Sequence, residues 1–561
     1  MKRCVLLALL LALSTPAFAD RYIVVTRHPI PSAIRPLPND DFSPGPRHRV
    51  RGFISINGFA ADLDDADLAV LKKSSDVEWI EPVLERHAFD LSPASNVDTI
   101  QSGQQVIPYG ISLVKAPAVW PVTKGRSLNG GATIHVAVID TGTRYGESEL
   151  QADYKGGHNF VNDTDDPLDD NGHGTHVAGI IAAADDNVGV VGVASGVELY
   201  SLKVLDACGS GSTADIISAI DWIIQKKAQI GGNWIANLSL GASNSSLAEQ
   251  TAFQHGADAG ILFFAASGNA YDPTNPNPTV AFPAGYPTVI AVGAIDSTST
   301  IADFSQRGPD LKVVAPGVDV LSTVVSAEVA TDDGRQFGAT LPVAETISGQ
   351  NICLPVPTVS GMFVACGVGN VSDFPSTVNG KIALIERGGL DPTGTKLTFA
   401  AKAKNAKAAG AIGVIVYNNT VSGVTPDLGS ISSTSAMPPF VFISAADGAA
   451  LKTTPNATLS MLYGYEGYEL MSGTSMATPH AVGVAALAWA VAPDATATAV
   501  ANAVINTATD LGDPGVDNTY GHGLVNAVDA AKQLNPAAFG NAGTPPPQVP
   551  RAGRTPGRRG H

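Results

Sequence analysis

Two kinds of apolar pattern alternate through the middle of the chain. Some segments are continuous apolar runs rich in β-branched residues, which is typical of strands buried on both faces. The segments between them place apolar residues at helical spacing. This alternation predicts a mostly parallel sheet flanked by helices, an α/β fold. The predicted strands are 132–139, 234–240, 261–266, 288–294 and 311–314, and the predicted helices are 213–228 and 247–259.

A smaller α/β pattern precedes this region. Residues 21–25, 50–54 and 77–82 are predicted strands, and 64–73 is a predicted helix. They define a small domain over 22–87. The polar stretch 90–103 that follows is predicted to be a cleavable linker.

The alternation breaks near residue 330 and resumes near residue 468. Within the break, 381–385 and 412–417 are predicted strands and 399–409 a predicted helix. A run this long with its own alternation indicates an inserted domain, which we place at 338–462. The large domain then comprises 104–337 and 463–534. The tail, 535–561, is rich in Pro, Gly and Arg and is predicted to be disordered or removed.

The first nineteen residues have the pattern of an export signal. Lys2 and Arg3 are followed by a short apolar run at 5–13 and the small-residue site Ala17-Phe18-Ala19. The run is too short to span a bilayer comfortably, and no later segment is long and apolar enough to act as an anchor. A secreted protein without a membrane span is therefore predicted.

Composition limits the partners. The 561 residues carry a net charge of −17, which argues against nucleic acid because phosphate would be repelled. The acidic residues either solubilise the surface or bind Ca²⁺ in places. Without the signal, Cys208, Cys353 and Cys366 remain. The short spacing between Cys353 and Cys366 predicts that they pair in an oxidising compartment, leaving Cys208 as a free thiol.

Three short motifs carry candidate chemistry. Asp140 ends an apolar strand, His173 opens an apolar helix, and Ser475 opens another. A nucleophilic serine needs a base, and that base needs a carboxylate to fix its tautomer. Taken singly, an Asp after a strand is a common turn former and a Ser in this position a common helix cap. Their joint occurrence in the order Asp, His, Ser favours a catalytic triad. His176, inside the helix, is predicted to be a packed structural residue.

These motifs resemble those of the subtilisin family (subtilases) of serine proteases. The resemblance implies a subtilisin-like fold with Asp140, His173 and Ser475 as the triad. Residues 265–269 resemble the family's oxyanion segment, which makes Asn269 the side-chain donor, together with the backbone N–H of Ser475. Thr474 is a weaker third contributor.

The resemblance also implies a substrate groove that binds an extended peptide by strand addition. Two segments would line its edges, and a third would wall the primary pocket. The small residue Ala281 resembles a pocket-base position and suggests that large apolar side chains are accepted. The edge residues are Gly209, Ser210, Gly211, Ser239, Leu240 and Gly241, and the pocket residues are Ala266, Ser267, Gly268 and Ala281.

A calcium loop is implied in the same way. Residues 184–190 follow the His173 helix and resemble the family's strong structural Ca²⁺ loop. The implied ligands are the side chains of Gln105, Glu149 and Asp186 and the carbonyls of Ala184, Val188 and Val190. The family usually has Asp where Glu149 stands and Asn where Asp186 stands, but all are oxygen donors that suit Ca²⁺.

Two further domains resemble known modules. Residues 22–87 resemble the family's propeptide, a folding chaperone and then a transient inhibitor, and 104–110 resembles a mature N-terminus. The insert resembles a protease-associated (PA) domain, either a substrate gate or a passive spacer. Together these features predict a monomeric secreted endopeptidase made as a zymogen, with protein or peptide substrates.

Three other functions are each compatible with part of the sequence. An inactive peptide-binding protein conflicts with the intact catalytic residues. A protease inhibitor acting through 22–87 would require that domain to remain attached. A serine esterase or lipase would carry a Gly-x-Ser-x-Gly motif, which the Gly473-Thr474-Ser475 segment lacks.

Overall fold

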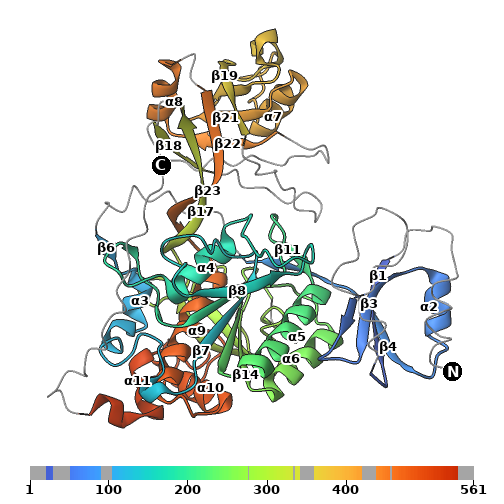
Figure 1. Cartoon of the computed structure of the whole chain (residues 1–561), viewed down its shortest axis with the longest axis vertical. Coiled ribbons are helices and arrows are strands. Elements are labelled where there is room, and N and C mark those ends of the chain that lie inside the picture. Colours follow the sequence, from blue (N-terminus) through green and yellow to red (C-terminus); the bar gives the residue numbers. More distant parts are fainter. Residues whose placement is uncertain are drawn as a thin grey trace.

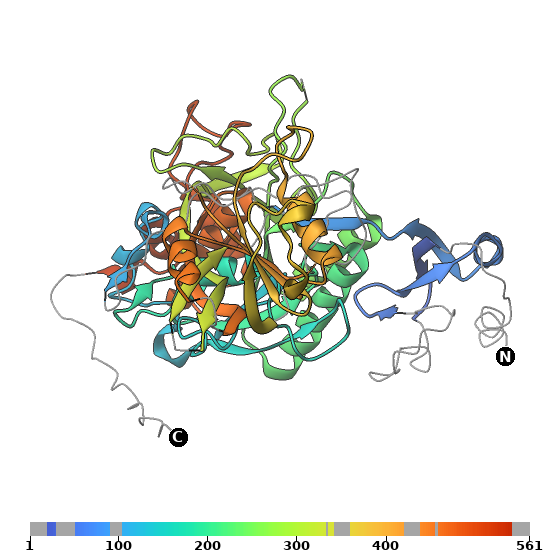
Figure 2. The ribbon, with the colours of Figure 1, turned by 90° about the horizontal axis from the view of Figure 1, so that it is seen from above.

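The computed structural model describes residues 20–29, 51–89, 104–275, 277–332, 335–340, 359–419, 438–454 and 458–540. These residues form a small N-terminal domain, a large central domain, and a barrel carried on a two-stranded stalk (Figure 1). Seen from above, the N-terminal domain lies to one side of the central domain (Figure 2). The predicted signal (1–19) and linker (90–103) lie outside the described residues.

The central domain is built on a parallel sheet of seven strands in the order β16-β15-β14-β12-β7-β10-β8. Strands β7, β14 and β15 are buried at every residue, because helices cover both faces. The predicted strands are therefore confirmed. The strands are β7 (Ile134–Asp140), β8 (Tyr154–Asn159), β10 (Glu198–Lys203), β12 (Asn233–Leu238), β14 (Ile261–Ala266), β15 (Val289–Ile295) and β16 (Leu311–Pro316).

Helix α9 (Thr474–Val491) is the core of this domain. Every one of its residues is buried, and it packs against β12, β14, β15 and β16. Its small side chains allow this closeness: a Cβ at Gly483 would lie 2.4 Å from Val193 Cβ. The other helices are α3 (Tyr109–Leu113), α4 (His173–Ala182), α5 (Thr213–Ile230), α6 (Leu247–Asp258), α10 (Ala497–Asn506) and α11 (Ala527–Leu534).

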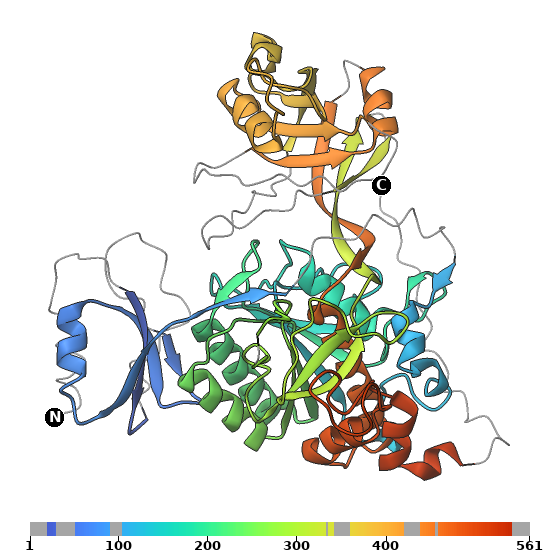
Figure 3. The same ribbon diagram turned by 180° about the vertical axis from the view of Figure 1, so that it is seen from behind.

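The N-terminal domain is an antiparallel sheet, in the order β2-β3-β1-β4, with one helix. Asp64 caps the helix by accepting from the backbone N–H groups of Ala66 and Asp67. Strand β3 was not among the predicted strands. From β4 the blue chain runs on into the central domain (Figure 3). The elements are β1 (Asp20–Thr26), β2 (Arg51–Phe53), β3 (Gly58–Leu63), α2 (Asp65–Leu71), β4 (Val77–Pro82) and β5 (Glu85–Ala88).

The inserted domain is a closed barrel in the order β17-β18-β22-β21-β20-β19-β23. Strands β17 and β23 also form the stalk, because they pair antiparallel from Val320 opposite Met471 to Thr331 opposite Leu459. The three elements predicted inside the insert, β20, α7 and β21, are confirmed. The bounds are β17 (Val320–Thr331), β18 (Gln336–Thr340), β19 (Val359–Ala365), β20 (Ile382–Glu386), α7 (Phe399–Ala408), β21 (Gly413–Tyr417), β22 (Phe440–Ile443), α8 (Ala445–Lys452) and β23 (Thr458–Met471).

Two sequence predictions were wrong. Cys366 is a free, fully buried thiol in the barrel, and burial raises its pKa to about 12. Cys208 is the disulfide-bonded one, with a partner outside the described residues. Proximity in sequence therefore did not predict the pairing. The tail also begins later than residue 535, since Asn535 Nδ2 donates to the Val491 carbonyl at 2.6 Å and 536–539 form a 3₁₀ turn. Within the described residues, no helix has the length and apolar character of a membrane span.

Candidate active site

Asp140 and His173 meet where a strand ends and a helix begins. Asp140 is the last residue of β7, and His173 is the first of α4. His173 Nδ1 donates to Asp140 Oδ1 at 2.7 Å, and both side chains are at most 1% exposed. Because Nδ1 carries the hydrogen, Nε2 of the neutral ring is left as a proton acceptor.

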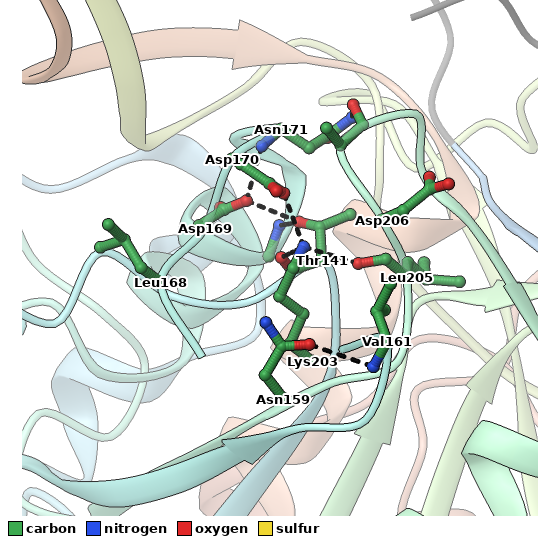
Figure 4. Close-up of polar contacts among 12 residues, drawn as sticks. Thr141, Asn159, Val161, Leu168, Asp169, Asp170, Asn171, Lys203, Leu205 and Asp206 are labelled. Carbon is green, nitrogen blue, oxygen red and sulfur yellow. Dashed lines mark hydrogen bonds and ion pairs between the residues drawn. The ribbon is translucent and has the colours of Figure 1, made fainter. Parts of the chain in front are cut away.

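A second carboxylate, that of Asp169, holds the end of β7 and the start of α4 together (Figure 4). Its Oδ1 accepts from the Thr141 hydroxyl at 2.9 Å and from the Gly172 amide at 2.9 Å. Its Oδ2 accepts from the Thr175 amide at 2.9 Å and the Thr175 hydroxyl at 2.6 Å. Thr141 Oγ1 in turn accepts from the Gly174 amide at 2.9 Å. The Asp169 carboxylate thus binds both the residue directly after Asp140 and the residues on either side of His173.

Lys203, at the end of β10, places a positive charge near Asp169. Its ammonium donates to the Thr141 carbonyl, to Asp170 Oδ1 and to the Leu205 carbonyl at 2.6, 2.6 and 2.7 Å (Figure 4). Burial opposes ionisation of Asp169. The charge of Lys203 and the donated hydrogen bonds outweigh this, so the pKa of Asp169 is lowered.

Ser475 contacts the end of β12, the strand next to the one that ends in Asp140. Its hydroxyl donates to the Ser239 carbonyl at 2.9 Å, and the Ser239 hydroxyl donates to the Ser475 carbonyl at 2.8 Å. Ser239 directly follows β12, which pairs with β7. Asp140 contacts His173, and Ser475 contacts the residue that follows the neighbouring strand, so all three lie at the carboxyl edge of the sheet. Ser475 is more than 300 residues from Asp140 in sequence.

The side chain of Asn269 is fixed by Thr474. Asn269 Oδ1 accepts from the Thr474 amide and from the Thr474 hydroxyl, both at 2.9 Å. This places the Nδ2 group on the other side, where it donates to the Phe89 carbonyl at 3.0 Å. A side chain at Gly473 would collide with the same carbonyl oxygen, 2.5 Å from a Cβ there.

Strand β5 brings this carbonyl to Asn269. It lies between β11 (Ser210–Ser212) and β13 (Leu240–Gly241) and pairs antiparallel with both. The Ala88 amide donates to the Gly209 carbonyl at 2.9 Å and the Phe89 amide to the Ser239 carbonyl at 3.4 Å. Strand β5 therefore lies between the two predicted groove edges, 209–211 and 239–241, in the place predicted for a substrate.

The predicted pocket walls lie together beside this strand. The Ala281 amide donates to the Ser267 carbonyl at 2.8 Å, and a Cβ at Gly268 would lie 3.1 Å from Ala281 Cβ. Ala266, Ser267 and Ala281 are buried. The Phe89 ring lies against Gly241, where its Cε2 and Cζ would be 2.9 Å from an added Cβ. A large aromatic side chain therefore occupies this end of the groove.

The predicted calcium loop supplies a set of converging oxygens. The carbonyls of Ala184, Val188 and Val190 point to one side-chain atom, Gln105 Nε2, at 2.7, 3.3 and 3.2 Å. The carboxylate of Glu149 is buried. It lies beside the loop, since its Oε1 is 1.8 Å from where a Gly189 Cβ would be. Tyr468 donates to that oxygen at 2.7 Å. Three converging carbonyl oxygens beside a buried carboxylate are a donor set that fits a hard cation such as Ca²⁺, with Gln105 turning its amide oxygen to the ion in place of Nε2.

Asp186, the remaining predicted side-chain ligand, accepts from the Val188 amide at 3.1 Å and so shapes the loop itself. His176 is fully buried and its Nε2 bonds to the Glu469 carbonyl at 3.0 Å. Burial lowers the pKa of His176 to about 3, so the ring stays neutral as a packed residue.

Sequence reasoning missed several residues of this site. Asp169 and Thr141 could have been noticed from their nearness to His173 and Asp140, but both are ordinary turn residues by type. Arg86 and Glu249 form a fully buried ion pair in the groove, with 0% exposure of each side chain. They lie 163 residues apart, so no local pattern connects them.

We predict that Asp169→Asn lowers kcat for a chromogenic peptide by about 10–100-fold with little change in KM, because a shift of the Asp140–His173 pair costs turnover rather than binding. Thr141→Val should act in the same direction, and Thr141→Ser, which keeps the hydroxyl, should restore most of the rate. A kcat for Asp169→Asn within twofold of the parent would contradict this positioning role.

Comparisons with known proteins agree with the geometry. The model of the subtilase family matches residues 131–340, and that of the PA domain matches 357–451, inside the predicted insert. The first match includes Asp140, His173 and Asn269, and the fold brings Ser475 to them.

Individual relatives extend the match. Subtilisin E of Bacillus subtilis is 38% identical over 286 residues, 51% of this chain and 68% of the relative. Subtilisin DY of Bacillus licheniformis is 43% identical over 235 residues, which are 42% of this chain and 81% of the relative. The crystal structure of Apa1, a psychrophilic subtilisin-like protease from an Antarctic Pseudoalteromonas, has 30% identity and a TM-score of 0.47, covering 78% of this chain and all of that one. The chain belongs to the subtilase family of serine proteases.

Proposed function

We propose that this subtilase is a secreted endopeptidase made as a self-cleaving zymogen, with Ser475 as nucleophile, His173 as general base and Asp140 as the residue that orients His173. The observation that carries the proposal is the Phe89 carbonyl, held by Asn269 Nδ2 at 3.0 Å in a strand-paired groove. A substrate carbonyl at this place faces a donor suited to the oxyanion that forms during acyl transfer.

The chemistry follows from the contacts. The Ser475 hydroxyl turns from the Ser239 carbonyl towards His173 Nε2, which takes its proton as Oγ attacks the peptide carbonyl. Asp140 accepts the Nδ1 hydrogen and stabilises the imidazolium. Asn269 and the Ser475 amide donate to the oxyanion. His173 then protonates the leaving amine as the C–N bond breaks. Water, deprotonated by His173, hydrolyses the acyl-enzyme and releases the serine.

The N-terminal domain acts as the transient inhibitor in this scheme. Polar contacts at three places support its docking besides β5. Arg51 forms an ion pair with Asp215, the amides of Ile54 and Ser55 donate to Asp221, both at 2.6 Å, and Glu81 accepts from the amides that open α6. While it is docked, β5 fills the groove that a substrate needs.

Calcium belongs to the proposal as a structural ion. Gln105, Glu149 and Asp186 and the carbonyls of Ala184, Val188 and Val190 would hold it. Bound there, Ca²⁺ would tie the loop after α4 to β6 (Gln105–Val106), which already pairs with β9 (Gly189–Val190).

The first test of this proposed function concerns the nucleophile. Ser475→Ala should lower turnover of casein by roughly 10⁵–10⁶-fold, the scale of the loss of kcat when subtilisin's own nucleophilic serine is removed. Asp258→Asn, at an exposed position on α6, serves as a folded control with unchanged turnover. Equal turnover by the parent and Ser475→Ala would end the proposal.

The second concerns self-cleavage. Since the Phe89 carbonyl lies at Asn269, we expect the first cut between Phe89 and Asp90, so that the processed protein begins at Asp90 until trimming shortens it towards Gln104. N-terminal sequencing and intact mass of early processing products test this. Phe89→Asp should slow processing at least about tenfold, because a charge enters an apolar pocket, whereas Phe89→Tyr should process normally. A first product that begins elsewhere would contradict the assignment.

The third concerns calcium. Chelation should lower the unfolding temperature of the processed protein by about 5–15 °C, because an ion that binds only the native state stabilises it by mass action. Asp186→Ala should remove most of the chelator effect. Asp185→Ala, next to it but ion-paired with Lys124, should retain it. An unfolding temperature that chelation leaves unchanged, with no metal by elemental analysis, would remove calcium from the proposal.

A further inference from the structure

The register of β5 defines which residue of a bound chain lies at each place in the groove. Arg86 is opposite Gly211 of β11, and His87 is opposite both Ser210 of β11 and Gly241 of β13. The carbonyl held by Asn269 belongs to Phe89. Counting back from the bond after Phe89, Arg86 is the fourth residue. Its side chain marks the place that a substrate's fourth residue before the cut would take.

Arg86 is completely enclosed there. Its guanidinium meets the Glu249 carboxylate at two points, Nε to Oε1 at 3.2 Å and Nη2 to Oε2 at 2.5 Å. Neither side chain is exposed. A planar guanidinium that donates two parallel hydrogen bonds to one carboxylate is a specific match in shape and in charge.

Glu249 is held by the central domain itself. The Tyr286 hydroxyl donates to Glu249 Oε2 at 2.7 Å. Ser246 caps α6, and the pattern Ser246-x-x-Glu249 would ordinarily turn the glutamate back onto the Ser246 amide. Here that amide donates to the Tyr286 hydroxyl instead, at 2.9 Å. Tyr286 therefore accepts the hydrogen bond of the Ser246 amide at the start of α6, and the Glu249 carboxylate is free to face the groove.

The position of Glu249 does not depend on the N-terminal domain. When 20–89 dissociate, α6, Tyr286 and Glu249 remain, and the buried carboxylate loses its counter-ion. A substrate with an apolar side chain at the fourth place would bury that charge unpaired, which is costly. A substrate with a guanidinium would restore the pair.

We propose that Glu249 makes the groove select arginine at the fourth residue before the cleaved bond, so that the enzyme prefers substrates of the form Arg-x-x-Phe. The inference rests on the proposed peptidase function and names its substrate class. Lysine, a single point charge, fits the two carboxylate oxygens less well and ranks between arginine and leucine.

The processed wild-type enzyme gives the direct test. Four chromogenic amides with the sequence X-His-Ala-Phe, where X is arginine, lysine, citrulline or leucine, are compared by kcat/KM. Citrulline keeps the shape of arginine without its charge. Arginine should exceed leucine and citrulline by about 30-fold or more, the effect of losing one partner of a buried ion pair. Arginine within twofold of leucine would overturn the inference.

Variants assign the effect to Glu249. Glu249→Gln should reduce the advantage of arginine to within about threefold, both by weakening the arginine substrate and by raising kcat/KM for the leucine substrate, because the cost of an unpaired charge disappears. Asp258→Asn removes a carboxylate from the exposed end of the same helix and should keep the full preference. An arginine preference that survives Glu249→Gln would overturn the assignment.

The two proposals fail differently. Turnover of the leucine substrate without a preference for arginine would overturn the selection by Glu249 and leave the peptidase intact. No turnover of any of the four, with casein also untouched, would overturn the peptidase proposal and the selection together. If Glu249→Gln does not mature, the wild-type substrate series still decides the question.

Discussion

The pairing of β17 with β23 is the constraint on which the rest of the molecule depends. The sheet is complete at β16, which ends at Pro316, but the helix that carries Ser475 begins only at Thr474. The barrel lies between them in sequence. Because the two stalk strands pair from Val320 opposite Met471, the chain leaves and re-enters the central domain at one place. The Gly473 amide donates to the Gly317 carbonyl at 2.8 Å, so the chain returns to the central domain two residues before Ser475.

The stalk also contacts the helix that begins with His173. Ser322 and Thr323 of β17 donate to the carbonyls of His176 and Thr175 in α4, at 2.8 and 3.0 Å. Asp169 binds the amide of the same Thr175. The stalk and Asp169 thus both hold the start of α4, and His173 is oriented by elements that come from three separate parts of the chain.

Local pattern explains what could be predicted. Strands such as β14 are apolar throughout because both faces are buried, and the residues around Asp140, His173 and Ser475 are contiguous, so each motif could be recognised by itself. Long-range partners could not be recognised. Strand β5 is a four-residue segment with mixed polarity, and it is a strand only because the groove supplies neighbours on both sides. Arg86 and Glu249 each look like surface charges in sequence, and only the fold shows that they bury one another. The cysteines mislead for the same reason, since distance along the chain does not measure distance in space.

Covalent labelling of the nucleophile tests the central claim, that Ser475 is the reactive serine and that β5 blocks it. The processed protein, separated from 20–89, is treated with a fluorophosphonate, and the modified residue is mapped by mass spectrometry. The account predicts one modified serine, Ser475, and almost no labelling while the N-terminal domain is still bound. Modification of a different serine, or equal labelling of Ser475 with that domain in place, would contradict it.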